Sequence, residues 1–139
     1  MDVDKLLKAL DNENNKKFLN LNTKKINDMK LEILKELQLS NDDLKTLMQK
    51  LKEYVYIDEM NELSYGAFIR WIPIKDPDNI HLTPGGILCE INATDSGILL
   101  TFKNFAHKHY RIKMDECLIF QKLTGQEQVL LSAMDYIAT

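Results

Sequence analysis

The sequence has 139 residues, of which 45% are hydrophobic and 28% charged, and these fractions are ordinary for a single globular domain. The formal net charge is −3, so binding to nucleic acid or to an anionic membrane would need a local basic surface. No apolar run approaches the roughly 20 residues that span a bilayer, and the N-terminus resembles neither a signal nor a transit peptide. We therefore expect an intracellular, soluble protein.

The N-terminal part of the sequence predicts helices. A short amphipathic helix fits residues 2–10, and the polar, Asn-rich segment 11–22 is typical of a loop. Helical spacing of apolar residues then predicts a helix over residues 23–38, for which Thr23 is a candidate N-cap. The apolar positions of this helix are Ile26, Met29, Ile33, Leu34 and Leu37.

A further helix is predicted from Ser40 or Asn41, either of which can cap it, to about residue 58. Because only two or three residues join it to the preceding helix, we expect an antiparallel αα-hairpin over residues 23–60. Its apolar stripe either packs in the core or is exposed to a partner helix, and in the second case residues 23–58 could form a homo-oligomer. The stripe consists of Leu44, Leu47, Met48, Leu51, Tyr54 and Val55.

The spacing of apolar residues changes from a helical period to a period of two near residue 65. We predict a small five-stranded antiparallel barrel of the SH3/Tudor-like kind over residues 65–121, because the main competitor, an OB-fold, needs a helix between its third and fourth strands and there is no room for one here. A closing helix over residues 124–138, capped by Thr124, is expected to pack on this barrel. The fold class is therefore α+β. The predicted strands are 67–74, 86–92, 98–102, 109–114 and 117–121.

Catalytic, metal-binding and cofactor-binding motifs are missing from the sequence. The Gly85-Gly86 pair follows a loop rather than a strand that leads into a helix, so it predicts a positive φ angle or a close backbone approach and no phosphate site. His107, His109 and Cys117 lack the ligand spacing of a zinc site. We expect no enzyme, metal or cofactor, and we interpret Cys89 and Cys117 as buried small hydrophobes.

One local stretch, residues 103–113, is rich in cations and aromatic residues and contains no acid. Alternation on a β-hairpin places His109, Arg111 and Lys113 on the solvent face, with Tyr110 on the buried face beside Ile112 and Met114. Such a surface suits either nucleic acid or an acidic protein segment, although it could also be an ordinary solvated face. The candidate partner-binding residues are Lys103, Phe105, His107, Lys108, His109, Arg111 and Lys113.

A second candidate surface lies on the first predicted strand. Trp71 is more often a core residue at such a position, but together with Tyr65 and Arg70 it could form the wall of a peptide groove. Sequence alone does not indicate which aromatic residues converge.

Three runs, Glu62–Ile72, Leu82–Leu88 and Ile112–Leu123, resemble uncharacterised proteins of giant nucleocytoplasmic DNA viruses. The resemblance extends over Leu44–Phe120 and implies a viral protein in the host cytoplasm, the viral factory or the virion, and it transfers no functional residue. From the residues themselves we predict a non-enzymatic interaction module that binds an anionic partner. The alternatives are a structural or particle-associated subunit that assembles through the helical hairpin and, third, a small enzyme.

Overall fold

The computed structural model describes residues 3–11 and 21–138 of the chain. The elements divide between two compact units, one formed by residues 35–122 and the other by residues 1–34 together with 123–139. The first unit contains a β-sheet and one α-helix, and the second contains helices. The predicted α+β class is therefore confirmed.

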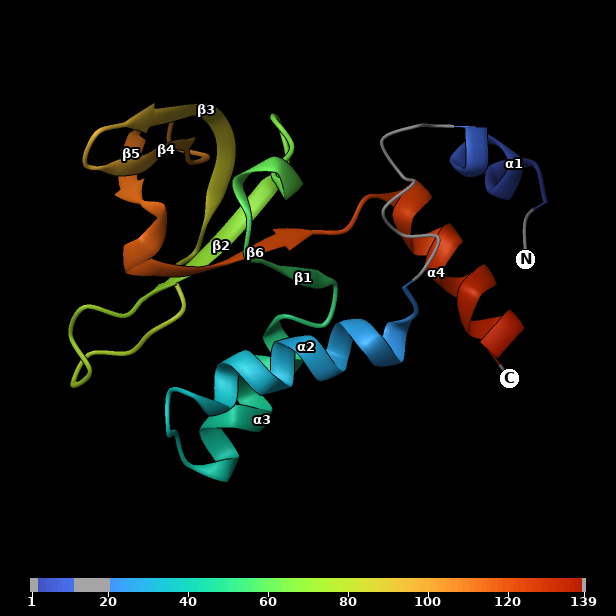
Figure 1. Ribbon diagram of the computed structural model, residues 1–139, viewed down its shortest axis with the longest axis horizontal. Helices are drawn as coiled ribbons and strands as arrows, with labels where there is room; N and C mark the ends of the chain where they lie inside the picture. Colours follow the sequence, from blue (N-terminus) through green and yellow to red (C-terminus); the bar gives the residue numbers. More distant parts are fainter. Residues whose placement is uncertain (1–2, 12–20, 139) are drawn as a thin grey trace. The chain divides into compact units, whose positions relative to one another are not determined.

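The unit of residues 35–122 is built on a six-stranded antiparallel sheet with the strand order β1–β6–β2–β3–β4–β5 (Figure 1). Strands β1 and β5 form its two edges, so the sheet is open and the expected closed five-stranded barrel is wrong. The strands are β1 (Tyr54–Ile57), β2 (Phe68–Pro73), β3 (Gly86–Thr94), β4 (Gly97–Lys103), β5 (His109–Lys113) and β6 (Cys117–Lys122).

The additional strand is β1, which the sequence pattern placed at the end of a helix. Tyr54 lies opposite Lys122 and Ile57 lies opposite Ile119 in an antiparallel ladder with β6. The helix predicted to continue to residue 58 instead ends at Lys50. The segment from residue 54 to 57 is aromatic and β-branched, and such residues favour a pleated strand when a partner strand is present.

The neighbouring strands β2 and β6 are buried on both faces of the sheet. Ile69, Trp71 and Ile72 of β2 are all buried although neighbours in a strand point to opposite faces. In β6, four consecutive side chains from Leu118 to Gln121 are buried as well. The apolar residues that the sequence shows on both faces of β2 are thus explained by burial on both sides.

The sheet is strongly curled although it does not close. The ring of Trp71 on β2 stacks on that of Phe102 on β4, with centroids 4.5 Å apart and an interplanar angle of 22°. Strand β3 lies between these two strands in the sheet order, and in a flat sheet they would be about 10 Å apart. Curvature therefore brings the two rings into one core.

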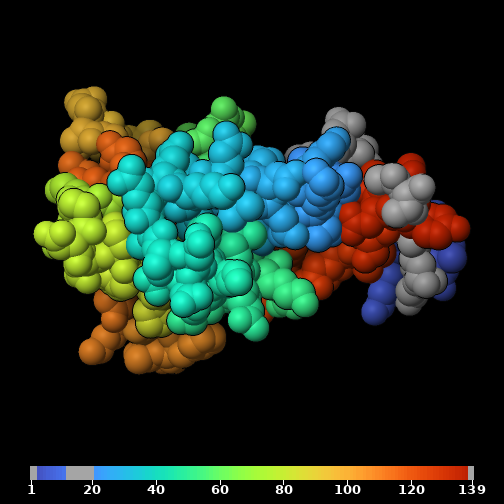
Figure 2. Space-filling view, turned by 90° about the horizontal axis from the view of Figure 1, so that it is seen from below, coloured from blue at the N-terminus to red at the C-terminus, as the bar shows by residue number. Residues whose placement is uncertain are grey.

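Helix α3 (Asn41–Lys50) lies at the surface of the same unit (Figure 2). Ser40 caps it, because the Ser40 hydroxyl accepts a hydrogen bond of 3.2 Å from the N–H of Asp43. Of the apolar stripe predicted from the sequence, Leu51 is fully buried and Val55 belongs to β1, while Leu44, Leu47 and Met48 are half-buried. Homo-oligomer formation through residues 23–58 remains a prediction.

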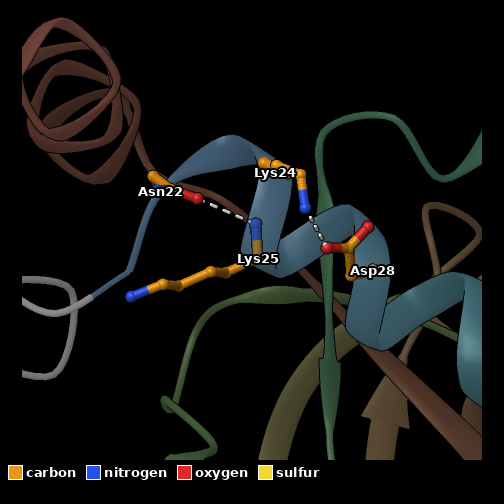
Figure 3. Close-up of polar contacts among 4 residues, drawn as sticks. All are labelled: Asn22, Lys24, Lys25 and Asp28. Carbon is orange, nitrogen blue, oxygen red and sulfur yellow. Dashed lines mark hydrogen bonds and ion pairs between the residues drawn. The ribbon is translucent and has the colours of Figure 1, made fainter. Parts of the chain in front are cut away.

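Helix α2 (Thr23–Lys35) belongs to the second unit and begins at a cap different from the predicted one. The side-chain oxygen of Asn22 accepts a 2.8 Å hydrogen bond from the N–H of Lys25, so Asn22 and not Thr23 is the cap (Figure 3). Thr23 instead donates through its N–H and its hydroxyl to the carboxylate of Asp135. Four residues apart, Lys24 and Asp28 form an exposed ion pair of 2.9 Å.

The other two helices of this unit are α1 (Val3–Asp11) and α4 (Gly125–Ala138), which pack against each other. Thr124 caps α4 as predicted, since its hydroxyl accepts the N–H of Glu127 and the Glu127 carboxylate accepts the N–H of Thr124. The packing of this helix on the sheet, which the sequence suggested, remains a prediction. The predicted loop 11–22 falls largely on residues 12–20, which lie outside the described residues.

Within the described helices, none combines the length and apolar character that a membrane crossing requires. Among residues 3–11 and 21–138, no group of three His, Cys, Asp or Glu side chains could hold a metal ion.

Candidate functional site

The turn between β4 and β5 is organised by Asn104. The Asn104 N–H donates to the carbonyl of Lys108, and the N–H of His107 donates to the carbonyl of Asn104, both at 3.0 Å. The Asn104 side-chain oxygen also accepts the N–H groups of Ala106 and Lys108. With His107 in the left-handed region at φ 61°, this is a three-residue hairpin loop of a standard kind, and it fixes the pairing register of the hairpin.

The register places the basic residues of the hairpin on one face. Directly opposed residues of an antiparallel pair share a face, and Lys103 lies opposite His109. Along the same face, Arg111 lies opposite Thr101 and Lys113 lies opposite Leu99. The predicted grouping of His109, Arg111 and Lys113 is thus present in the structure.

The opposite face of the hairpin differs from the sequence prediction. Tyr110 was expected in the core, but it is 45% exposed, whereas Phe102 directly across from it is fully buried. The Tyr110 hydroxyl lies 3.3 Å from the side-chain nitrogen of Asn104. Ile112 is half-buried, and Met114 belongs to the short 3-10 turn η3 (Met114–Glu116) rather than to the strand.

Strand β5 pairs with β4 on one side and with no other described strand. In an antiparallel ladder the residues of an edge strand alternate between bonding their neighbour and pointing their backbone groups outward. The Asn104 N–H bonds the carbonyl of Lys108, so Lys108 is a residue that points its carbonyl toward the neighbouring chain. Counting on from Lys108 by alternation, the residues whose backbone points outward are His109, Arg111 and Lys113. The basic residues His109 and Arg111 therefore also offer free N–H and C=O groups on this edge, and Lys113 offers its N–H, since its carbonyl begins the turn η3.

Two cavities, of about 500 Å³ and about 320 Å³, border β5 and share Trp71, Arg111 and Ile112 in their linings. We call the two together the β5 groove. The larger also has Pro73, Lys75, Leu99, Lys113, Glu116 and Cys117 in its lining, and the smaller Thr83, Pro84, Gly85, Asn104 and Tyr110.

The segment that carries Thr83 and Pro84 is held to β2 by three hydrogen bonds. The Thr83 N–H donates to the carbonyl of Trp71, the N–H of Trp71 donates to the Thr83 hydroxyl, and the Arg70 Nε donates to the Thr83 carbonyl at 2.8 Å. These bonds fix one wall of the β5 groove. No sequence motif indicates this wall, because it depends on contacts between residues separated by about a dozen positions.

The remaining predicted site residues do not gather at the β5 groove. Phe105 is 82% exposed at the turn, where it stacks on Phe68 with ring centroids 5.8 Å apart. Lys108 is exposed at the same turn. Neither Tyr65, which is 67% exposed, nor Arg70 is among the described residues that line the groove, so the structure does not bring them together with Trp71 there. Adjacent residues of a strand face opposite ways, which separates the Arg70 and Trp71 side chains.

The β5 groove combines charged groups with an apolar floor. Lys75 forms an ion pair of 3.1 Å with Glu116, so its charge is partly compensated within the protein. The side chain of Arg111 forms no ion pair with the residues that the structure describes. Trp71 and Ile112 provide apolar surface between these charges. The arrangement suits an extended ligand that carries negative charge and some apolar side chains.

The two cysteines differ from each other and from the expectation that both are buried. Cys89 is exposed, and Cys117 is half-buried. Burial, with the nearby carboxylates of Glu116 and Asp115, raises the pKa of the Cys117 thiol to about 11.

We expect the two thiols to react at very different rates. At about pH 8 only roughly one Cys117 thiol in a thousand would be ionised, and the thiolate is the reactive form. A chromogenic disulfide reagent should therefore modify Cys89 rapidly and Cys117 only after addition of denaturant. Cys89→Ser should remove the rapid phase; a rapid phase that persists in this variant would contradict the assignment.

Comparison of the chain with protein-family models, with curated proteins and with solved structures gives no match. Function must therefore be inferred from the geometry of the site.

Proposed function

We propose that the protein is a non-enzymatic interaction module that binds an acidic protein segment at the β5 groove. The observation that carries this proposal is the position of Arg111: it belongs to the basic face of the hairpin and lines both cavities beside β5. His109 and Lys113 extend the same face, and neither forms an ion pair with a described residue. An acidic segment would gain complementary charge along the whole strand.

An acidic peptide fits this site better than nucleic acid does. The chain carries a net charge of −3, whereas nucleic-acid affinity depends on several cations that neutralise phosphates. In the larger cavity Lys75 is already paired with the carboxylate of Glu116, which leaves fewer free cations than the several contacts that a phosphate backbone requires. The exposed ring of Phe105 stacks on Phe68 rather than standing free for a base.

Titration with a peptide of alternating Glu and Val residues tests the proposal. Trp71 is the single tryptophan and lines both cavities, so its fluorescence should report binding. Binding should weaken as salt rises from about 50 to about 200 mM, because screening reduces exposed charge attraction. A peptide of alternating Lys and Val is the matched control and should not bind.

The double variant Arg111→Ser, Lys113→Ser should weaken binding about tenfold at low salt, since each exposed ion pair contributes up to about 1 kcal/mol. Its free energy of unfolding should change by no more than about 0.5 kcal/mol. The matched variant Lys45→Ser, Lys50→Ser alters two exposed lysines of α3 and should bind as the unmodified protein does.

Single- and double-stranded DNA and RNA oligonucleotides complete the test. If an oligonucleotide binds more tightly than the Glu–Val peptide at the same salt, a nucleic-acid ligand replaces the acidic peptide. If the peptide does not bind even at low salt, the proposal is overturned.

A further inference from the structure

The free edge of β5 offers a backbone surface as well as a charged one. His109 and Arg111 direct their N–H and C=O groups away from β4, as Lys113 does its N–H, and no described backbone group pairs with them; the carbonyl of Lys113 instead begins the turn η3. An edge strand with unpaired backbone groups is a template for pairing with another strand. The cavities that Arg111 and Ile112 line show that hollow space, rather than packed side chains, borders this strand.

We infer that the acidic segment binds as an additional antiparallel strand on the edge of β5. The inference rests on the proposed function and adds to it the conformation and orientation of the ligand. Every described strand pair of the sheet is antiparallel, and antiparallel pairing is slightly more stable per residue than parallel pairing. Strand addition of this kind obtains affinity from main-chain hydrogen bonds and specificity from alternate side chains.

The two faces of β5 determine the side chains that such a ligand should have. Its residues alternate between the basic face of His109, Arg111 and Lys113 and the face of Tyr110 and Ile112. The ligand side chains on the basic face should therefore be acidic. Those on the other face should be apolar, because Tyr110 and Ile112 lie in the lining of the smaller cavity together with Trp71.

The other edge strand, β1, does not suit the same ligand. Its side chains Tyr54, Val55 and Ile57 are buried. Carboxylates flank it in sequence, with Glu53 before it and Asp58 after it, and these would repel an acidic segment. Charge complementarity therefore selects β5 and not β1.

Backbone methylation of the Glu–Val peptide tests the inference without a change in the protein. In an antiparallel pair, two residues that exchange backbone hydrogen bonds lie directly opposite each other, and their side chains point to the same side of the sheet. The Glu residues, on the face of Arg111, would therefore be the ones that donate to β5. One peptide carries N-methyl groups on three Glu residues, and its matched control carries them on three Val residues.

We expect the methyl-Glu peptide to bind roughly tenfold or more weakly than the unmodified peptide, because its hydrogen bonds to β5 are lost. The methyl-Val peptide should bind as the unmodified peptide does. Equal binding of all three peptides would overturn strand addition and leave the proposed function in place, and selective loss with methyl-Val would overturn the antiparallel orientation. Absence of binding by the unmodified peptide would instead overturn the proposed function itself.

Discussion

Replacing Gly85 with alanine is expected to lower the free energy of unfolding by about 3 kcal/mol. Gly85 has φ +89°, a conformation that costs a residue with a Cβ atom roughly 1–2 kcal/mol. The added Cβ would also clash with the backbone oxygen of Ile69 and lie 2.9 Å from the Cγ of Arg70. Because a backbone atom cannot move aside as the end of a flexible side chain can, relief of this clash must displace β2. Urea denaturation of the purified variant would measure the loss.

Gly66 provides the matched control for this substitution. Its φ is +82°, close to that of Gly85, but an added Cβ would meet no atom within 4 Å. Gly66→Ala should therefore cost only the backbone strain, about 1 kcal/mol. Equal losses in the two variants would show that the close approach of Gly85 to β2 contributes nothing to stability.

The periodicity of the sequence predicted much of the sheet, because strand alternation is a local property. Strand β5 was predicted within one residue of its end, and the pair Gly85-Gly86 was correctly expected to provide a positive φ angle. Helices α1 and α4 were likewise found from their apolar spacing and, for α4, from the Thr124 cap. Each of these features depends on residues close together in the chain.

Strand β1 was missed because its residues fit two patterns. Leu51, Tyr54 and Val55 continue a helical stripe, and the same aromatic and β-branched residues also favour a strand. The pairing of Tyr54–Ile57 with β6 decides between the two, and its partner residues lie more than sixty positions further along the chain. The same long-range pairing leaves the sheet open, since β1 occupies the edge beside β6 and β5 keeps its own edge free.

The sequence predicted only the part of the candidate site that depends on residues close together in the chain. The basic face of the hairpin follows from alternation within a single strand, and the register confirms it for His109, Arg111 and Lys113. The β5 groove could not be predicted, because Trp71, Pro84 and Ile112 come from separate elements that only the curl of the sheet brings together. Alternation also assigned Tyr110 to the core, since it does not report how far the core extends along an edge strand.

Phe102 and Tyr110 show this limit most clearly. They lie directly opposite each other on β4 and β5 and therefore share a face of the sheet. Phe102 is fully buried and stacks on Trp71, whereas Tyr110 is 45% exposed. The core of this unit thus includes Phe102 on β4 but does not extend to Tyr110 on β5.

We expect Phe102→Ala to destabilise the protein by about 3–5 kcal/mol, because it removes a buried ring and leaves a cavity beside Trp71. Tyr110→Ala removes an aromatic ring from the same face and should cost about 1 kcal/mol or less, since much of that ring is already in water. Urea denaturation followed by far-UV circular dichroism measures both losses, and the fluorescence of Trp71 should shift strongly in the first variant alone. A loss for Tyr110→Ala as large as that for Phe102→Ala would place the tyrosine in the core, as alternation by itself predicts. Tyr110 would then no longer provide an exposed aromatic side chain to the lining of the smaller cavity of the β5 groove.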